Sequence, residues 1–176
     1  MVKVMKICLM KTTKILILIV FTQLLVSPTV LYANGKASDT VSSQVRCSVC
    51  GMFVAKYPNW LAQVHYDDQN QAKFFDGVKD MMVFYFDPER YEAPPRESIK
   101  NLYVKDYYSL KWFSANDAFY VIGSDVYGPM GHELIPFESK GAAESFLKDH
   151  HGKEIITFGD ITPELIDSLR AGQRMR

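Results

Sequence analysis

The hydrophobic pattern of this chain predicts the same order of elements twice: strand, strand, helix, strand. In the first copy, alternating apolar residues over 60–66 and a short apolar run over 72–75 predict two strands joined by a turn. The apolar residues of 78–86 fall on one face of a helix, for which Asp76 is the expected N-cap. Residues 102–104 predict the strand that completes this copy.

The second copy follows the same order in the C-terminal half of the chain. The apolar segments 118–122 and 132–137 predict two strands, and Ser139 is the expected N-cap of the helix that follows. Residues 154–158 predict the closing strand, and a short last helix is expected to begin at Thr162.

These patterns predict an α+β fold class with two small, similar ββαβ lobes. The chain has 176 residues, of which 48% are hydrophobic, and this is enough to form a packed core. We place the first lobe at 47–110 and the second at 111–172. They are preceded by an export signal over 1–33 and a polar, flexible tether over 34–46.

The N-terminal segment has the three-part layout of a secretory signal. Its lysines lie before an almost purely apolar run at 15–26, and small or turn-forming residues follow up to Ala33. The run is shorter than the roughly 20 residues that span a bilayer, so we expect cleavage near Ala33 and no permanent membrane span. Cys8 precedes the run and no cysteine directly follows it, so the sequence shows no lipidation site. The predicted location is the periplasm.

The chain after the predicted signal has more acidic than basic residues, although the whole sequence is neutral. Of the 20 basic and 20 acidic residues, four lysines and no acidic residue lie in 1–33, so the remainder has 16 basic and 20 acidic residues. A nucleic-acid-binding protein needs a basic surface that displaces counterions from phosphate. The mildly acidic mature chain therefore argues against nucleic acid as a partner.

Removal of the signal leaves two cysteines, Cys47 and Cys50, in a C-x-x-C spacing. Three uses of this pair are open: a disulfide, a redox pair and a metal site. A disulfide would close a very small loop and constrain the unfolded chain little. A redox pair normally follows a strand in a βαβ unit, whereas this pair follows a polar segment. Gly51 and Met52 come next and add a thioether beyond a flexible residue, which favours metal binding.

A second sulfur lies in a loop of the second copy. Met130 stands between Gly128-Pro129 and Gly131, so it belongs to neither a helical nor a strand stripe. It either folds back onto the core, as methionines often do, or presents its thioether on an exposed turn. His132 follows as a candidate imidazole ligand or as a hydrogen-bonding partner of a ligand.

Four segments in this order resemble the NosL family, the accessory proteins of nitrous-oxide reductase: CSVCGM at 47–52, FDG at 75–77, AFYVIGS at 118–124 and GPMGHE at 128–133. The resemblance extends over about 44–161. It implies two related ββαβ lobes, a single Cu(I) site, and delivery of copper to the apo form of that multi-copper enzyme. Family members are commonly lipoproteins, whereas this chain lacks a lipidation cysteine, so it is expected to be soluble or held by a partner.

Copper(I) fits the available side chains. It is a soft ion that prefers thiolate and thioether sulfur and accepts two or three ligands, whereas zinc requires about four. We expect one Cu(I) per chain. The candidate ligands are first Cys50 and Met130, then Cys47, Met52 and His132, with fewer than all of them bound at once. The implied partners are a copper donor and an apo cuproenzyme, in particular nitrous-oxide reductase.

The sequence contains no nucleophile with a credible base, no P-loop and no dinucleotide-binding fingerprint, so we predict a carrier and not an enzyme. Two alternatives remain open. The first is an envelope thiol-disulfide oxidoreductase that uses Cys47 and Cys50. The second is a metal-free interaction module in which these cysteines form a disulfide. Trp112 and Phe113 are interpreted as a packing anchor between the lobes.

We predict that the mature protein begins within a few residues of Asn34. Intact-mass measurement of protein from the soluble envelope fraction checks this directly, with protein made without export as the control for the full-length mass. A retained segment 1–33 would contradict the export signal, and an added diacylglycerol mass would contradict the absence of lipidation.

Overall fold

The structure is a computed structural model that describes residues 37–66 and 72–172 of the chain. The predicted export signal, 1–33, lies outside the described residues. Within the residues described, no helix is long and apolar enough to cross a membrane.

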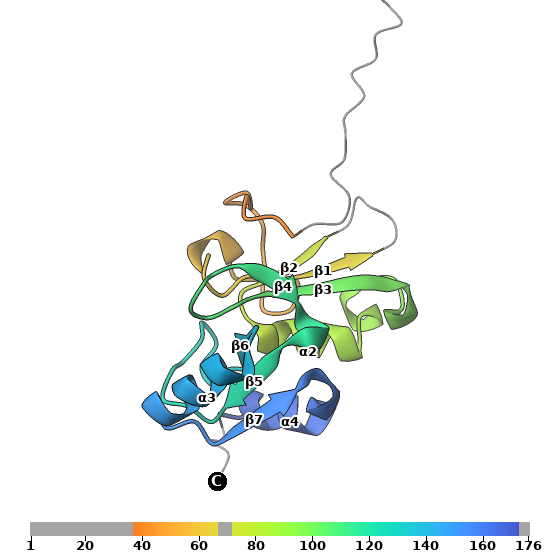
Figure 1. Cartoon of the computed structure of the whole chain (residues 1–176). Coiled ribbons are helices and arrows are strands. Elements are labelled where there is room, and N and C mark those ends of the chain that lie inside the picture. The colour runs from red at the N-terminus through yellow and green to blue at the C-terminus, as the bar shows by residue number, and fades with distance from the viewer. Residues whose placement is uncertain (1–36, 67–71, 173–176) are drawn as a thin grey trace, which may run out of the picture. The chain divides into compact units, whose positions relative to one another are not determined.

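The first sheet is formed by β1 (Ala62–Tyr66), β2 (Lys73–Phe75), β3 (Ile99–Lys105) and β4 (Trp112–Ser114), and helix α2 (Val78–Phe86) lies between β2 and β3 in the sequence. Its strands are antiparallel and follow the order β2-β1-β3-β4 (Figure 1). Val64 of β1 lies opposite Lys73 of β2 on one side and Leu102 of β3 on the other. Helix α2 packs against β1 and β2.

The second sheet is formed by β5 (Phe119–Ile122), β6 (Ile135–Phe137) and β7 (Glu154–Thr157), with α3 (Lys140–Asp149) before β7 and α4 (Pro163–Arg170) after it. It is also antiparallel, with the order β6-β5-β7 (Figure 1). The predicted α+β class is confirmed, because the described residues form two antiparallel sheets with separate helices. Along the chain, the order of two strands, a helix and a further strand occurs twice, as β1-β2-α2-β3 and as β5-β6-α3-β7. Short 3₁₀ helices lie at Val54–Lys56, Glu89–Tyr91, Arg96–Ser98, Ala115–Asp117 and Phe158–Asp160.

The main hydrophobic core is continuous across the two sheets. Buried residues of β1, α2 and β3 pack in one cluster with Tyr120 and Ile122 of β5 and with Ile166 of α4. Because neighbouring residues of a strand point to opposite faces, Val121 belongs to a smaller cluster instead, which it shares with Phe146 of α3. The second sheet is therefore covered on one face by the shared core and on the other by α3.

One strand of the predicted second lobe belongs to the first sheet. This strand, β4, pairs with β3, with Trp112 opposite Lys105. The connecting turn is stabilised by the Asp106 carboxylate, which accepts hydrogen bonds from the N–H groups of Tyr108 (3.1 Å) and Ser109 (2.7 Å). The sequence did not predict β4, because three residues are too few to show strand alternation.

The N-terminus of α2 is capped by a distant side chain. The N-cap residue is Gly77 and not Asp76 as predicted, and Gly77 has no side chain to accept a hydrogen bond. Instead, Glu133 accepts hydrogen bonds through Oε1 from the N–H groups of Lys79 (2.6 Å) and Leu134 (2.9 Å). A Cβ atom on Gly77 would collide with this carboxyl group, so the close approach requires glycine.

This position of Glu133 also shortens a predicted strand. The sequence predicts a strand over 132–137, but β6 begins at Ile135, because the preceding loop turns Glu133 towards α2. The predicted N-caps of α3 and α4, Ser139 and Thr162, are confirmed, since each side chain accepts a hydrogen bond from the first turn of its helix. Local capping signals were therefore reliable except where a distant residue replaced them.

The segment before Cys47 is bound to the first sheet from Ser38 onwards. The backbone of Ser38 exchanges two hydrogen bonds with the side chain of Gln63 on β1 (3.2 and 2.7 Å). Asp39 forms an ion pair with Lys105 (2.7 Å) and accepts a hydrogen bond from the indole N–H of Trp112 (2.9 Å). The described part of the predicted flexible tether thus has fixed contacts, which its polar composition did not indicate.

We predict that Glu133→Ala lowers the free energy of unfolding by about 2–4 kcal/mol, because it leaves two buried N–H groups without an acceptor. Burial raises the pKa of Glu133 to about 8, so the carboxyl group is largely protonated near neutral pH and glutamine is a close mimic. Glu133→Gln should therefore cost less than about 1 kcal/mol. Urea-induced unfolding checks both variants, and equal losses would show that the lost acceptor is not the cause.

Candidate metal centre

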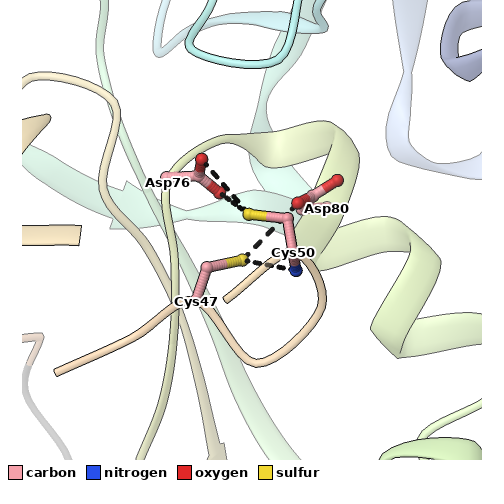
Figure 2. Close-up of side chains that lie close together, drawn as sticks. All are labelled: Cys47, Cys50, Asp76 and Asp80. Carbon is pink, nitrogen blue, oxygen red and sulfur yellow. Dashed lines mark hydrogen bonds between the residues drawn. The ribbon is translucent and has the colours of Figure 1, made fainter. Parts of the chain in front are cut away.

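Four side chains converge at the N-terminal end of α2: Cys47, Cys50, Asp76 and Asp80 (Figure 2). Their two sulfur atoms and one carboxylate oxygen from each aspartate all lie within 4.8 Å of one another. The cysteines come from the turn at 47–52, whereas Asp76 directly precedes the N-cap of α2 and Asp80 lies in its first turn. We call these four residues the thiol–carboxylate cluster.

Backbone hydrogen bonds hold the cysteine turn in one shape. The N–H of Cys47 donates to the carbonyl of Met52 (2.7 Å), and the N–H of Gly51 donates to the carbonyl of Cys47 (3.0 Å). Gly51 has a φ of +78°, a conformation that favours glycine. The N–H of Cys50 donates to the sulfur of Cys47 (3.5 Å), a contact that would stabilise a thiolate at that position.

The turn is also anchored to its surroundings. Arg46 and Phe53 form an antiparallel bridge, and the Arg46 guanidinium lies 3.9 Å from the centre of the Phe53 ring. The same guanidinium donates to the carbonyl of Gly51 (2.8 Å), and the N–H of Ser48 donates to the carbonyl of Phe74 on β2 (3.1 Å). The two sulfur atoms therefore lie on a preformed loop, which reduces the entropy lost when an ion is bound.

Each thiol donates a hydrogen bond to a carboxylate. The sulfur of Cys47 lies 3.5 Å from Oδ2 of Asp80, and the sulfur of Cys50 lies 3.4 Å from Oδ1 of Asp76 (Figure 2). Both cysteines are free thiols, and Cys47 is buried whereas Cys50 is partly exposed. Because a carboxylate only accepts, the thiol protons are what holds the two pairs together.

Burial keeps these thiols protonated near neutral pH. It raises the pKa of Cys47 far above its ordinary value and the pKa of Cys50 to about 11, and the Asp80 carboxylate adds to the rise at Cys50. The pKa of Asp80 is raised too, first by burial and then by the negative charge of Asp76. A cation bound here would displace the thiol protons and offset the repulsion between the carboxylates, so its binding should release protons.

The donor atoms of the cluster include both soft sulfur and hard oxygen. Thiolate sulfur is a preferred ligand of Cu(I), which accepts sites with few ligands. Two sulfurs with two carboxylate oxygens would also complete the tetrahedron that zinc prefers. The residues present thus fit a sulfur-bound ion, and the relative affinity for the two metals distinguishes a copper site from a zinc site.

The structure brings together only part of the ligand set that the sequence predicts. Cys47 and Cys50 meet in the cluster, as described above. Met52 closes the cysteine turn, but its sulfur accepts a weak hydrogen bond from the hydroxyl of Tyr57 (3.9 Å). Met52 is therefore adjacent to the cysteines in the chain, with its thioether in contact with a different partner.

Met130 and His132 lie on the loop between β5 and β6, which contacts the same end of α2. Met130 is 47% exposed, and its carbonyl accepts a hydrogen bond from the ammonium of Lys79 (2.7 Å). The backbone carbonyl of His132 accepts a second hydrogen bond from this ammonium (2.7 Å). The imidazole ring of His132 lies 4.9 Å from the ring of Tyr127, measured between ring centres. The loop is thus bound to the residue that precedes Asp80, although His132 is not among the clustered side chains.

Sequence reasoning missed both carboxylates of the cluster. The sequence predicts Asp76 as an N-cap, but Glu133 fills that role, and the Asp76 carboxylate faces Cys50 instead. A signal was available, because two aspartates four residues apart at the start of a helix lie on the same side of it. Without the position of the cysteine turn, however, nothing connects Asp80 to a sulfur ligand.

Comparison with known proteins gives matches that agree with one another. The NosL family model matches residues 38–166. The copper-binding lipoprotein NosL of Achromobacter cycloclastes is 30% identical over 128 residues, which are 66% of this chain and 63% of that protein. The protein of the same name from Stutzerimonas stutzeri is 27% identical over 135 residues, 72% of this chain and 67% of its own length. This chain thus spans slightly less than two thirds of the first of these relatives.

A solved structure is also similar. It is the crystal structure of the copper chaperone NosL from Shewanella denitrificans, with a TM-score of 0.63 and 26% sequence identity. The match covers 74% of this chain and 98% of that chain, so the two share a fold over nearly the whole length of the solved protein.

We predict that Cys50 reacts with iodoacetamide at about pH 8 roughly tenfold more slowly than an ordinary cysteine, because only the thiolate reacts and its pKa is about 11. Cys47, which is buried, should react more slowly still. Asp80→Asn removes a nearby negative charge and should speed up alkylation of Cys50. Mass spectrometry of timed reactions measures these rates, with the urea-unfolded protein as the control. A Cys50 rate equal to that of the unfolded chain would contradict a protonated, protected thiol.

Proposed function

The chain belongs to the NosL family, and we propose that it is an exported, non-enzymatic carrier that holds one Cu(I) ion and passes it to a cuproenzyme. The observation that carries this proposal is the convergence of the Cys47 and Cys50 thiols on a preformed turn beside α2. Two sulfurs this close suit the low coordination number of Cu(I). The names of the relatives, copper-binding lipoprotein and copper chaperone, agree with it.

We propose Cys50 and Met130 as the principal ligands, with the set completed from Cys47, Met52 and His132. The exposure of these residues suits a carrier, since it increases from the buried Cys47 through the partly exposed Cys50 to the exposed Met130. A neutral thioether at the surface holds Cu(I) less strongly than a buried thiolate does, so the ion remains accessible to a recipient.

Asp76 and Asp80 act in this proposal as proton acceptors during loading. Each already accepts a hydrogen bond from one thiol, so each is in place to accept the proton that Cu(I) displaces and to pass it to solvent. On release of copper, protons return to sulfur by the same route. This return avoids leaving two bare thiolates in a largely buried site, which would be costly.

A thiol-disulfide oxidoreductase is the less favoured function. A redox-active cysteine needs a thiolate at neutral pH and therefore a lowered pKa. Burial raises the pKa of both Cys47 and Cys50 instead. The free thiols likewise favour a metal carrier over a metal-free module with a disulfide.

We propose that the recipient is the apo form of nitrous-oxide reductase in the periplasm and that a separate copper donor loads the carrier. Both curated relatives are named lipoproteins, which supports a site of action in the cell envelope. The test is transfer of copper from the loaded protein to apo nitrous-oxide reductase, compared with an unrelated apo cuproenzyme. Equal transfer to both would contradict a dedicated recipient.

We predict that the reduced protein binds one Cu(I) per chain in competition with a colorimetric Cu(I) chelator. Cys50→Ser should abolish tight binding, because it removes an anionic sulfur ligand. Met130→Leu should weaken binding roughly tenfold or more without unfolding the protein, since leucine is similar in size. Met82→Leu is the matched control. Because Met82 is fully buried in α2, this substitution should leave copper binding unchanged.

The same samples provide a second measurement. Copper should raise the melting temperature of the parent protein, and the rise should be smaller in Met130→Leu. Zinc binding as tight as copper binding, or no retained copper, would contradict a soft-metal carrier. Full affinity and a full thermal shift in Met130→Leu would restrict the site to the thiol–carboxylate cluster.

A further inference from the structure

Lys79 is a buried lysine whose ammonium group is bound by a loop of the second sheet. It lies in the first turn of α2 and is 2% exposed. Its Nζ donates hydrogen bonds to the backbone carbonyls of Met130 and His132, both at 2.7 Å. Burying a charged group costs several kcal/mol unless it is hydrogen-bonded, so an apolar residue would serve packing alone better. The position therefore indicates a specific task.

A second contact binds the same loop to the same residue. The carboxyl group of Glu133 accepts a hydrogen bond from the backbone N–H of Lys79 (2.6 Å), while the lysine side chain donates to the backbone carbonyl of Met130 in the same loop. Gly128 lies against Glu133 as well: a Cβ atom on Gly128 would be only 3.1 Å from Cγ and Oε2 of that side chain. The loop is thus held by both the backbone and the side chain of Lys79.

The loop is closed by local contacts, but its large apolar side chains are not packed in the core. Gly128 and Gly131 are joined by two backbone hydrogen bonds (2.8 and 3.1 Å), and Gly131 has a φ of +89° with open space where a Cβ atom would lie. Tyr127 and Met130 are exposed large side chains. A segment with few buried contacts samples many conformations unless other groups restrain it. The contacts to Lys79 and Glu133 supply that restraint.

The same turn of α2 also carries one of the carboxylates of the thiol–carboxylate cluster. Lys79 directly precedes Asp80, whose carboxylate accepts the hydrogen bond from Cys47. We propose that Lys79, assisted by Glu133, is a positioning residue that fixes the Met130 loop relative to the thiol–carboxylate cluster, so that thioether and thiols act on one ion. This inference rests on the proposed copper-carrier function.

Positioning matters more for Met130 than for the cysteines. The cysteines lie on a rigid turn, and a thiolate binds Cu(I) strongly. A thioether is neutral, so its contribution to affinity depends on how little conformational entropy is lost when it binds. Release of the loop from Lys79 would therefore reduce binding almost as much as removal of the thioether itself.

A double-mutant cycle tests this dependence. Cu(I) affinity is measured by chelator competition for the parent, Lys79→Leu, Met130→Leu and the double variant. Lys79→Leu should weaken binding roughly tenfold in the parent and have little further effect in the Met130→Leu background, because both changes remove the same contribution. Parental affinity in Lys79→Leu, or losses that simply add, would overturn the inference.

X-ray absorption of the copper-loaded proteins gives a readout that a general loss of stability would not change. The number of sulfur neighbours of copper should fall in Lys79→Leu as it does in Met130→Leu. Lys105→Leu is the matched control, because Lys105 is also largely buried, at 9% exposed, but pairs with Asp39. It should lower stability and leave both copper affinity and sulfur coordination unchanged.

A second variant covers the case in which Lys79→Leu does not fold. Gly128→Ala leaves the lysine in place but crowds the Glu133 side chain, which has to shift by a few tenths of an ångström, so it should weaken copper binding in the same direction. Gly141→Ala is its control, because a Cβ atom there meets nothing within 4 Å. Parental copper affinity in Gly128→Ala would count against the inference.

Amide hydrogen exchange of the protein without copper separates this inference from the proposed function. The amides of 127–133 should exchange faster in Lys79→Leu or Gly128→Ala than in the parent. If the parent binds no Cu(I), the proposed function fails whatever the loop does. If the parent binds Cu(I) but loop exchange is unchanged in both variants, only the positioning role fails.

Discussion

The contact between the N-terminal turn of α2 and the loop at 128–133 is the interaction on which the other features of the structure depend. Glu133 satisfies a backbone N–H of the helix that no local side chain accepts, and the ammonium of Lys79 satisfies two carbonyls of the loop. This exchange joins the second sheet to the helix of the first. It also leaves Asp76 facing Cys50 and not the helix backbone.

In the carrier that we propose, the charge balance of the thiol–carboxylate cluster lets one site both hold an ion and release it. Two carboxylates and two thiolates in a largely buried position would repel one another strongly, and the thiol protons prevent this. A bound cation would take over part of that role. Loading and release would then be exchanges of metal for protons.

In the carrier that we propose, the cysteine turn holds the ion and the Met130 loop transfers it. The cysteine turn is rigid and partly buried, and its shape depends on short-range hydrogen bonds together with the stacking of Arg46 on Phe53. The methionine loop is exposed and depends on contacts to a helix far away in the sequence. A carrier benefits from this division, because a recipient can approach the exposed thioether without unfolding the protected thiols.

The sequence by itself determined the fold class, the two strand–strand–helix–strand segments and the pair of cysteines, because each is a local signal: hydrophobic period, a cap such as Ser139, or residues close together in the chain. Only the tertiary structure decided which carboxylates join the site. Local preference favours Asp76 as the cap of α2, but Glu133, 54 residues after Lys79, takes that role. A buried N–H group needs an acceptor from wherever the fold can supply one, and no local pattern records that choice.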